Sequence, residues 1–202
     1  MEGAHNNLSG APELPRERWA EELAELIERC AKCDFVDKPF IRYRVYERWL
    51  PERVDVLVVV ESPPPGEKED FFYNLSKSDR LRRNLKLLLG LEITDEDLLA
   101  WLKERGVFIT DAIKCRPVKR ALRDVRLRVR MCLSCLYILE REVELLRPRR
   151  VIVMGETAQL ASAFLGLPCV MAFPHPNRMV RFSEEVRPIL GEALKRALVK
   201  RA

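Results

Sequence analysis

Cysteines are the first residues in this sequence whose type and spacing could do chemistry. Four of the six form two CxxC pairs, Cys30 with Cys33 and Cys132 with Cys135, and Cys115 lies between the pairs in the segment IKCRP. Thiolates at such spacings are ligands for zinc or for an iron–sulfur cluster. In a reducing compartment they are not expected to build a disulfide framework. The pattern therefore predicts a bound metal or cluster.

Ionisable side chains also follow three of the expected strands. Glu61 comes after the run VLVVV, Asp111 ends VFITD, and His175 lies in PHPNR. Ligands of parallel α/β sheets bind beyond the carboxyl ends of the strands, so the loops that carry these residues are candidates for ligand binding, and His175 is a candidate for catalysis. The structural alternative for His175 is a rigid turn in which the side chain only caps a backbone carbonyl. The structural alternative for Asp111 is an N-terminal helix cap or an ion-pair partner for Lys114. The second histidine, His5, lies in the N-terminal tail.

A strongly basic run occupies residues 114–130. It contains eight lysines and arginines against the single acid Asp124. A solvated helix face normally mixes charges of both signs, so this run favours contact with phosphates over simple solvation. The net charge of +5 also permits a polyanionic partner.

Strands and helices are expected to alternate along the chain. The predicted strands are residues 56–60, 107–110, 150–155 and 169–173, and the predicted helices begin near residues 15, 78, 94, 124, 157 and 183. This order predicts an α/β fold, a three-layer αβα sandwich around a central four-stranded, mostly parallel sheet. Residues 1–14 are expected to form a flexible tail and residues 15–202 a single domain.

Composition excludes several classes of protein. Apolar residues make up 48% and charged residues 33% of the 202, and the longest apolar run is too short to cross a bilayer. No secretory signal is visible, so we expect a cytoplasmic protein, and we expect it to be a monomer. The absence of a glycine-rich nucleotide fingerprint and of a P-loop weakens the case for a dehydrogenase or an NTPase. Glutamine is scarce beside Glu, Arg and Lys, which is typical of thermophiles.

Several segments together resemble one family. FITDAIKCRP, the stretch CLYILEREVELLRPRRVIVMGETA, the pair CAKC and the segment HPNR resemble the iron–sulfur uracil-DNA glycosylases of family 4 and its relatives, and VESPPPG occupies the place of that family's first motif. The resemblance runs from about Cys30 to about Arg178. It implies the uracil-DNA glycosylase fold, DNA as the partner and hydrolysis of an N-glycosidic bond.

The resemblance also implies a ligand set for the cysteines. A [4Fe-4S] cluster would be held by Cys30, Cys33, Cys115 and Cys135. Cys132 lies one turn earlier on the same helix face and stays open as the fourth ligand. The alternative is a zinc site that uses both CxxC pairs and leaves Cys115 out.

Catalytic roles follow from the same resemblance. His175 would donate a hydrogen bond to the base oxygen on which negative charge develops. Glu61 would lie near the attacking water and the flipped base, and Ser62 stands where other branches carry a water-activating Asp or Asn. Phe72 would stack on the flipped base, with packing in the core as its alternative. The first motif departs from the family, with Val60 where glycine is usual.

Asp111 occupies the position where relatives carry the asparagine that reads the base. An ionised carboxylate only accepts hydrogen bonds, which suits a base with an exocyclic amino group. A carboxyl group kept protonated by burial could donate to O4 and would accept uracil. The nature of the excised base therefore depends on the surroundings of Asp111.

The remaining expected contacts are with DNA. The candidate DNA-binding residues are Lys114, Arg116, Lys119, Arg120, Asn177 and Arg178, and the apolar Met179 and Val180 are candidates for a wedge in the duplex. The sequence thus predicts a DNA glycosylase of base excision repair that flips and removes uracil or another deaminated or modified base. The alternative is an iron–sulfur nucleic-acid-binding protein of the same fold without glycosylase activity.

Overall fold

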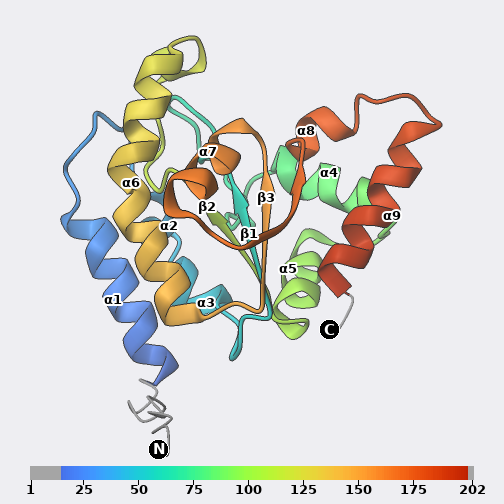
Figure 1. Ribbon diagram of the computed structural model, residues 1–202, viewed down its shortest axis with the longest axis horizontal. Coiled ribbons are helices and arrows are strands. Elements are labelled where there is room, and N and C mark those ends of the chain that lie inside the picture. Colours follow the sequence, from blue (N-terminus) through green and yellow to red (C-terminus); the bar gives the residue numbers. More distant parts are fainter. Residues whose placement is uncertain (1–14, 200–202) are drawn as a thin grey trace, which may run out of the picture.

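A computed structural model describes residues 15–199 of the chain. The helices and strands alternate along most of this range, as the hydrophobic pattern predicts (Figure 1). The helices are α1 (Arg16–Arg29), α2 (Pro39–Arg42), α3 (Val45–Trp49), α4 (Arg80–Leu89), α5 (Asp95–Glu104), α6 (Val125–Leu146), α7 (Glu156–Leu165), α8 (Pro176–Met179) and α9 (Val186–Val199), with a 3-10 helix at Lys119–Leu122. The strands are β1 (Val56–Val60), β2 (Val107–Asp111), β3 (Arg150–Met154) and β4 (Cys169–Phe173).

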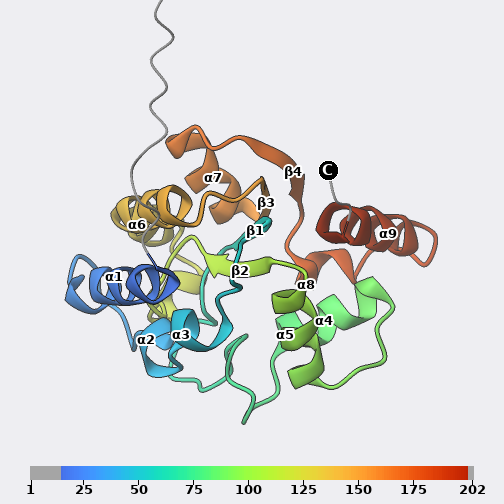
Figure 2. The same cartoon turned by 90° about the horizontal axis from the view of Figure 1, so that it is seen from below.

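The strands form one four-stranded parallel sheet in the order β2-β1-β3-β4. β1 and β2 are buried along their whole length, because helices cover both faces of the sheet. One layer contains α1, α6 and α7 and the other contains α4, α5 and α9, with the sheet between them (Figures 1 and 2). The expected three-layer sandwich is confirmed, and the sheet is parallel throughout.

Local sequence signals explain where several helices begin. Asp79 accepts a hydrogen bond from the N–H of Arg82 at the start of α4, Thr94 accepts from Asp97 at the start of α5, and Asp124 starts α6 in the same way. Each cap satisfies a backbone donor that has no partner inside its helix. These caps fix the residues at which α4, α5 and α6 begin.

The structure adds short elements that the sequence pattern did not predict. α2, α3 and α8 are each four or five residues long, too short to show a helical hydrophobic period. α9 begins at Val186, a few residues after the expected start at Ser183. The expected tail, residues 1–14, lies outside the described range. Between residues 15 and 199 no helix is both long and apolar enough for a bilayer span.

Candidate active site and cysteine cluster

The expected catalytic residues gather at the carboxyl edge of the sheet. Asp111, at the end of β2, is the register partner of Val60, so Glu61 begins the loop beside it. The N–H of Gly155, just after β3, donates to the carbonyl of Phe173 at the end of β4 with an N···O distance of 3.0 Å. His175 follows two residues later. Parallel strands thus bring segments that are distant in sequence to one edge.

Glu61 is fixed by the turn between β3 and α7. Its Oε1 accepts a hydrogen bond of 3.1 Å from the N–H of Thr157, in the first turn of α7. Gly155 has a φ of 98°, and a Cβ added there would lie 2.6 Å from Cγ and Cδ of Glu61. Only glycine permits both this backbone conformation and this close approach. The N-terminus of α7, with its free N–H groups, is a favourable environment for the Glu61 carboxylate.

His175 is half-buried and its ring orientation is set by the backbone of α8. Its Nδ1 accepts a hydrogen bond of 3.2 Å from the N–H of Asn177. Burial lowers the pKa of His175, and the neighbouring charge of Glu61 opposes this effect. A neutral ring whose Nδ1 accepts must carry its proton on Nε2, an assignment that rests on the hydrogen bond. The histidine is thereby prepared as a neutral donor through Nε2.

Asp111 lies in a very different environment, with 5% of its surface exposed. Burial raises its pKa to about 8, and the charges of Glu142 and Asp79 act in the same direction, while Lys114 and Arg116 oppose the shift. The carboxyl group is therefore mostly protonated at neutral pH and can donate a hydrogen bond. The protonated form considered from the sequence is the one that these surroundings favour.

The expectation that Lys114 binds phosphate is wrong in this structure. Its side chain is fully buried and forms an ion pair with Glu142 of α6, and its Nζ also donates to Thr110 Oγ1 at 2.5 Å. Glu142 accepts further hydrogen bonds from Thr110 and from the hydroxyl of Tyr46. A buried cation with these partners is not available to DNA, and the group instead joins α6 to the end of β2.

Arg116 is likewise internal and is removed from the expected DNA contacts. Its guanidinium donates to Asp37 Oδ1 at 2.8 Å and to the carbonyl oxygens of Pro64 and Asp70 at 2.8 and 3.1 Å. Its side chain is 0% exposed. Arg116 therefore stabilises the proline-rich loop after β1 by donating to its carbonyl oxygens. The prolines of this loop have no N–H and cannot donate backbone hydrogen bonds of their own.

The other expected DNA-binding residues lie nearer to solvent. Lys119 and Arg120 are exposed, and Arg120 forms an exposed ion pair with Asp34 at 2.7 Å. Arg178 is exposed and pairs with Glu156 at 2.5 Å. Exposed pairs of this kind are weak and leave both partners free to exchange for other ligands.

Three further candidates have contacts that limit their roles. Asn177 is half-buried, and its Oδ1 accepts from Asn84 Nδ2 at 2.7 Å, which links α8 to α4. Phe72 is 4% exposed and meets the Tyr73 ring edge-on, with centroids 4.9 Å apart, so the structure provides the packing partner expected in its alternative role. Stacking of Phe72 on a base stays a prediction. Ser62 is half-buried, and its hydroxyl donates to the carbonyl of Pro63 at 3.1 Å.

Four cysteines come together at the end of α1, opposite the N-terminal half of α6. Burial raises the pKa of Cys115 to about 12, and the neighbouring thiols of Cys135, Cys30 and Cys33 act in the same direction. Cys135 interacts in turn with Cys33 and Cys30, and Cys33 with Cys30. Every pair among the four is therefore close enough to interact electrostatically. Cys132 interacts only with Cys135 in this way.

The sulfur of Cys132 points elsewhere. It donates to the carbonyl of Thr157 in α7, with an S···O distance of 3.7 Å. Cys115 therefore interacts with the other three thiols, whereas Cys132 interacts with Cys135 alone. Within residues 15–199, no three His, Cys, Asp or Glu side chains have the geometry of a single-ion site.

The sequence pattern missed Glu142, although a signal was present. Cys135, Ile138, Leu139 and Leu146 mark the buried face of α6, and Glu142 falls on the same face. An acid on the apolar face of a helix predicts a buried cation as its partner. The partner, Lys114, lies 28 residues earlier, in the run that suggested phosphate contacts.

Comparison with known proteins places this architecture in a family. The family model described as the uracil DNA glycosylase superfamily matches residues 48–200. A type-5 uracil-DNA glycosylase of Pyrobaculum aerophilum is 25% identical over 177 residues, which cover 78% of this chain and 75% of that protein. A type-4 uracil-DNA glycosylase of the same organism is 29% identical over 139 residues, covering 67% of this chain and 60% of that protein. The chain belongs to the uracil DNA glycosylase superfamily.

Proposed function

We propose that this chain is a DNA glycosylase that removes uracil, or another deaminated or modified base, from DNA in base excision repair. The observation that carries the proposal is the neutral His175, whose Nδ1 accepts from the backbone and whose Nε2 is left to donate, at the sheet edge shared with Glu61 and Asp111. The names of the relatives, which specify uracil-DNA glycosylases, support the same chemistry.

The proposed reaction breaks the C–N bond between sugar and base and forms a C–O bond from water to the sugar. The bond's electron pair leaves with the base, so negative charge develops on a base oxygen, and the proton that the attacking water loses neutralises the departing base. A fixed donor such as Nε2–H of His175 stabilises that charge without reorganisation. Glu61, with one oxygen held by Thr157 N–H, has lone pairs left to orient the attacking water. Ser62 follows Glu61 in the same loop, and its hydroxyl donates to the carbonyl of Pro63.

Base selection is assigned to Asp111. With a pKa of about 8, its carboxyl group is protonated at neutral pH and can donate to O4 of uracil while its other oxygen accepts from N3–H. An asparagine presents the same donor and acceptor pair. Protonated Asp111 can therefore replace the usual amide, and an amino-bearing base becomes the better match only when the group ionises at higher pH.

The DNA-binding face would comprise the exposed Lys119, Arg120 and Arg178, with Asn177 positioned by its hydrogen bond to Asn84 of α4.

Met179 is 0% exposed and is not available as a wedge in this conformation. Phe182, three residues further on, has 44% of its surface exposed. We assign the wedge to Phe182, because an exposed apolar ring beside Arg181 suits insertion between base steps.

We propose that the bound group is a [4Fe-4S] cluster, which takes four cysteine thiolates. Cys30, Cys33, Cys115 and Cys135 would hold it, since they interact in every pair. A zinc site built on both CxxC pairs would need Cys132, whose sulfur is directed to α7. When bound, the cluster would supply a structural link between the end of α1 and the loop after β2.

The direct test is abasic-site formation on oligonucleotides that each contain a single uracil or another deaminated base. We expect the wild type to release uracil, and His175→Ala to slow release by about 100-fold to 1,000-fold, the usual effect of losing a donor to developing charge. DNA binding by His175→Ala should persist. His5→Ala, at the other histidine, is the matched control and should retain the wild-type rate. Binding without product from any lesion would support the non-enzymatic alternative instead.

A further inference from the structure

The second half of the basic run lies on α6, apart from the residues of the proposed active site. The first turns of this helix extend beyond the end of the sheet (Figure 1). A hollow of about 610 Å³ lies along them, and it is lined by Lys32, Val125, Arg126, Val129, Arg130, Leu133 and Ser134. Within the described part of the chain, this lining combines three cations with apolar side chains and contains no acid.

The apolar residues of the hollow form a stripe along α6. Val125, Val129 and Leu133 are four residues apart in turn, so they lie on one side of the helix over a length of about 12 Å. Val125 has 59% and Leu133 has 41% of its surface exposed. Large apolar side chains that are exposed together, rather than singly, indicate an interaction surface.

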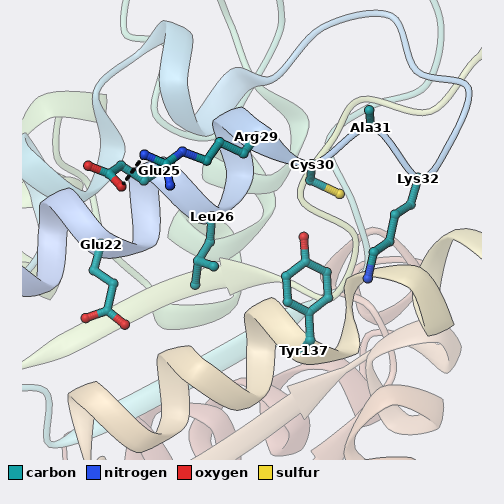
Figure 3. A pocket seen from close by; sticks show the side chains of 8 residues that line it. All are labelled: Glu22, Glu25, Leu26, Arg29, Cys30, Ala31, Lys32 and Tyr137. Carbon is teal, nitrogen blue, oxygen red and sulfur yellow. Dashed lines mark ion pairs between the residues drawn. The ribbon is translucent and has the colours of Figure 1, made fainter.

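Cations border this apolar stripe. Arg126 and Arg130 are both exposed and are also four residues apart, so they run parallel to it along α6. Lys32, from the loop after α1, is held against α6 by a cation–π contact in which its Nζ lies 3.9 Å from the centroid of the Tyr137 ring (Figure 3). The hollow is therefore both apolar and strongly positive.

The positive charge of the two arginines is not neutralised by the chain itself. Within residues 15–199, neither Arg126 nor Arg130 has an ion pair. The acids nearest to the hollow in sequence have other partners, since Asp124 caps α6 through the N–H of Leu127 and Asp34 pairs with Arg120. A complementary negative charge would therefore come from a partner.

We propose that the stripe and its cations are a docking surface for an acidic amphipathic helix of a partner protein. Apolar residues of that helix would pack on Val125, Val129 and Leu133, and its carboxylates would pair with Arg126 and Arg130. DNA fits this surface less well, because phosphate contacts are made by polar and charged groups and would leave the apolar stripe uncovered. The inference does not rest on the proposed glycosylase function.

The probe for this surface is a synthetic helical peptide with leucines at positions i, i+4 and i+8 and glutamates on both sides of them. Its affinity for the full chain is measured by fluorescence anisotropy. The affinities of a peptide with the same composition but scattered leucines, and of a lesion-free DNA duplex, are measured alongside. We expect the wild type to bind the striped peptide about 10-fold more tightly than the scattered one, the usual effect of an apolar anchor.

Two double variants separate the apolar stripe from the charge. Val125→Ser with Leu133→Ser should weaken binding of the striped peptide by about 10-fold and leave the affinity for DNA unchanged. Arg126→Gln with Arg130→Gln should also weaken peptide binding, and should reduce its dependence on salt, because the lost contacts are between charges. Leu87→Ser and Arg18→Gln are the matched controls, since both residues are exposed on other helices, and they should bind the peptide as the wild type does.

Circular dichroism checks that every variant is folded. Equal affinity of the wild type for the two peptides, or unchanged peptide affinity in the serine variant, would overturn the proposal. An arginine variant that loses affinity for DNA but keeps its affinity for the peptide would overturn it in favour of a phosphate-binding surface. A wild-type dimer that the serine variant abolishes, measured by analytical ultracentrifugation, would overturn it in favour of an interface between two copies of this chain.

Discussion

Glu61 and Asp111 end neighbouring strands of the same sheet, yet their surroundings are opposite. Glu61 accepts a hydrogen bond from the first turn of α7 and lies against Gly155. Asp111 is buried beside the Lys114–Glu142 pair, and its pKa is raised to about 8. The first environment suits a carboxylate and the second a neutral acid. We therefore expect the two carboxyl groups to have different roles, with Glu61 orienting the water and Asp111 reading the base.

The largest effect is expected on stability, from removing the buried ion pair between Lys114 and Glu142 beside Asp111. Lys114→Met leaves Glu142 buried and without its ion pair, which should lower the free energy of unfolding by about 3–5 kcal/mol. Denaturant unfolding monitored by circular dichroism measures the change. Because the cost arises from the unpaired acid, Lys114→Met combined with Glu142→Leu should recover most of it.

Lys119→Met is the matched control for that experiment. Lys119 belongs to the same basic run but is exposed, so its replacement should change the free energy of unfolding by no more than about 0.5 kcal/mol. A loss of less than about 1 kcal/mol in Lys114→Met would show that the buried pair does not hold this half of the site.

At Glu61, activity is expected to be lost when the carboxylate is displaced, without any change in charge. Gly155→Ala places a Cβ 2.6 Å from Glu61, so the carboxylate must move. A displacement of about 1 Å in such a group can cost about 100-fold in rate, and we expect uracil release to slow by about this factor. Single-turnover release of uracil measures it.

Gly166→Ala separates the displacement of Glu61 from backbone strain. Gly166 also has a positive φ, 59°, but no atom lies within 4 Å of the added Cβ. Both variants should lose stability, by about 1–2 kcal/mol for a left-handed residue with a side chain. Only Gly155→Ala should lose activity. Equal rates in the two variants would mean that Glu61 need not be held in this position.

A smaller effect, on the salt dependence of DNA binding, should show whether the exposed Lys119 and Arg120 contact phosphates. Replacing Lys119 and Arg120 by glutamine should reduce the slope of log affinity against log salt by about 0.9 for each lost phosphate contact, whatever the DNA sequence. Arg53→Gln is the control, since Arg53 precedes β1 at the opposite edge of the sheet. An unchanged slope in the double variant would mean that this part of the run is only a solvated surface.

The fold could be predicted from the sequence because its signals are local. The β-branched runs of β1 and β3 and the caps at Asp79, Thr94 and Asp124 each act within a few residues. The short α2, α3 and α8 could not, because four or five residues do not complete a hydrophobic period.

The site could be predicted only in part. The strand ends placed Glu61, Asp111 and His175 at one edge, as parallel topology requires. Burial depends on partners from distant segments, so a count of charges could not distinguish the buried Lys114 from the exposed Lys119. Likewise, the sequence favoured Cys135 as a ligand but left Cys132 open, and the hydrogen bond from the Cys132 sulfur to the carbonyl of Thr157 in α7 could not be predicted from it.

The most direct test of the account is the pH dependence of uracil release by the wild type and by Asp111→Asn, between pH 6 and pH 9.5. If protonated Asp111 reads the base, wild-type release should fall roughly 10-fold between pH 7 and pH 9, as the group with a pKa of about 8 ionises. Asp111→Asn, whose amide does not titrate, should lack this fall and exceed the wild type increasingly above pH 8. A wild type that releases uracil equally well across this range, with no gain from Asp111→Asn, would contradict the role given to Asp111. A wild type that releases no uracil at any pH would contradict uracil as its substrate.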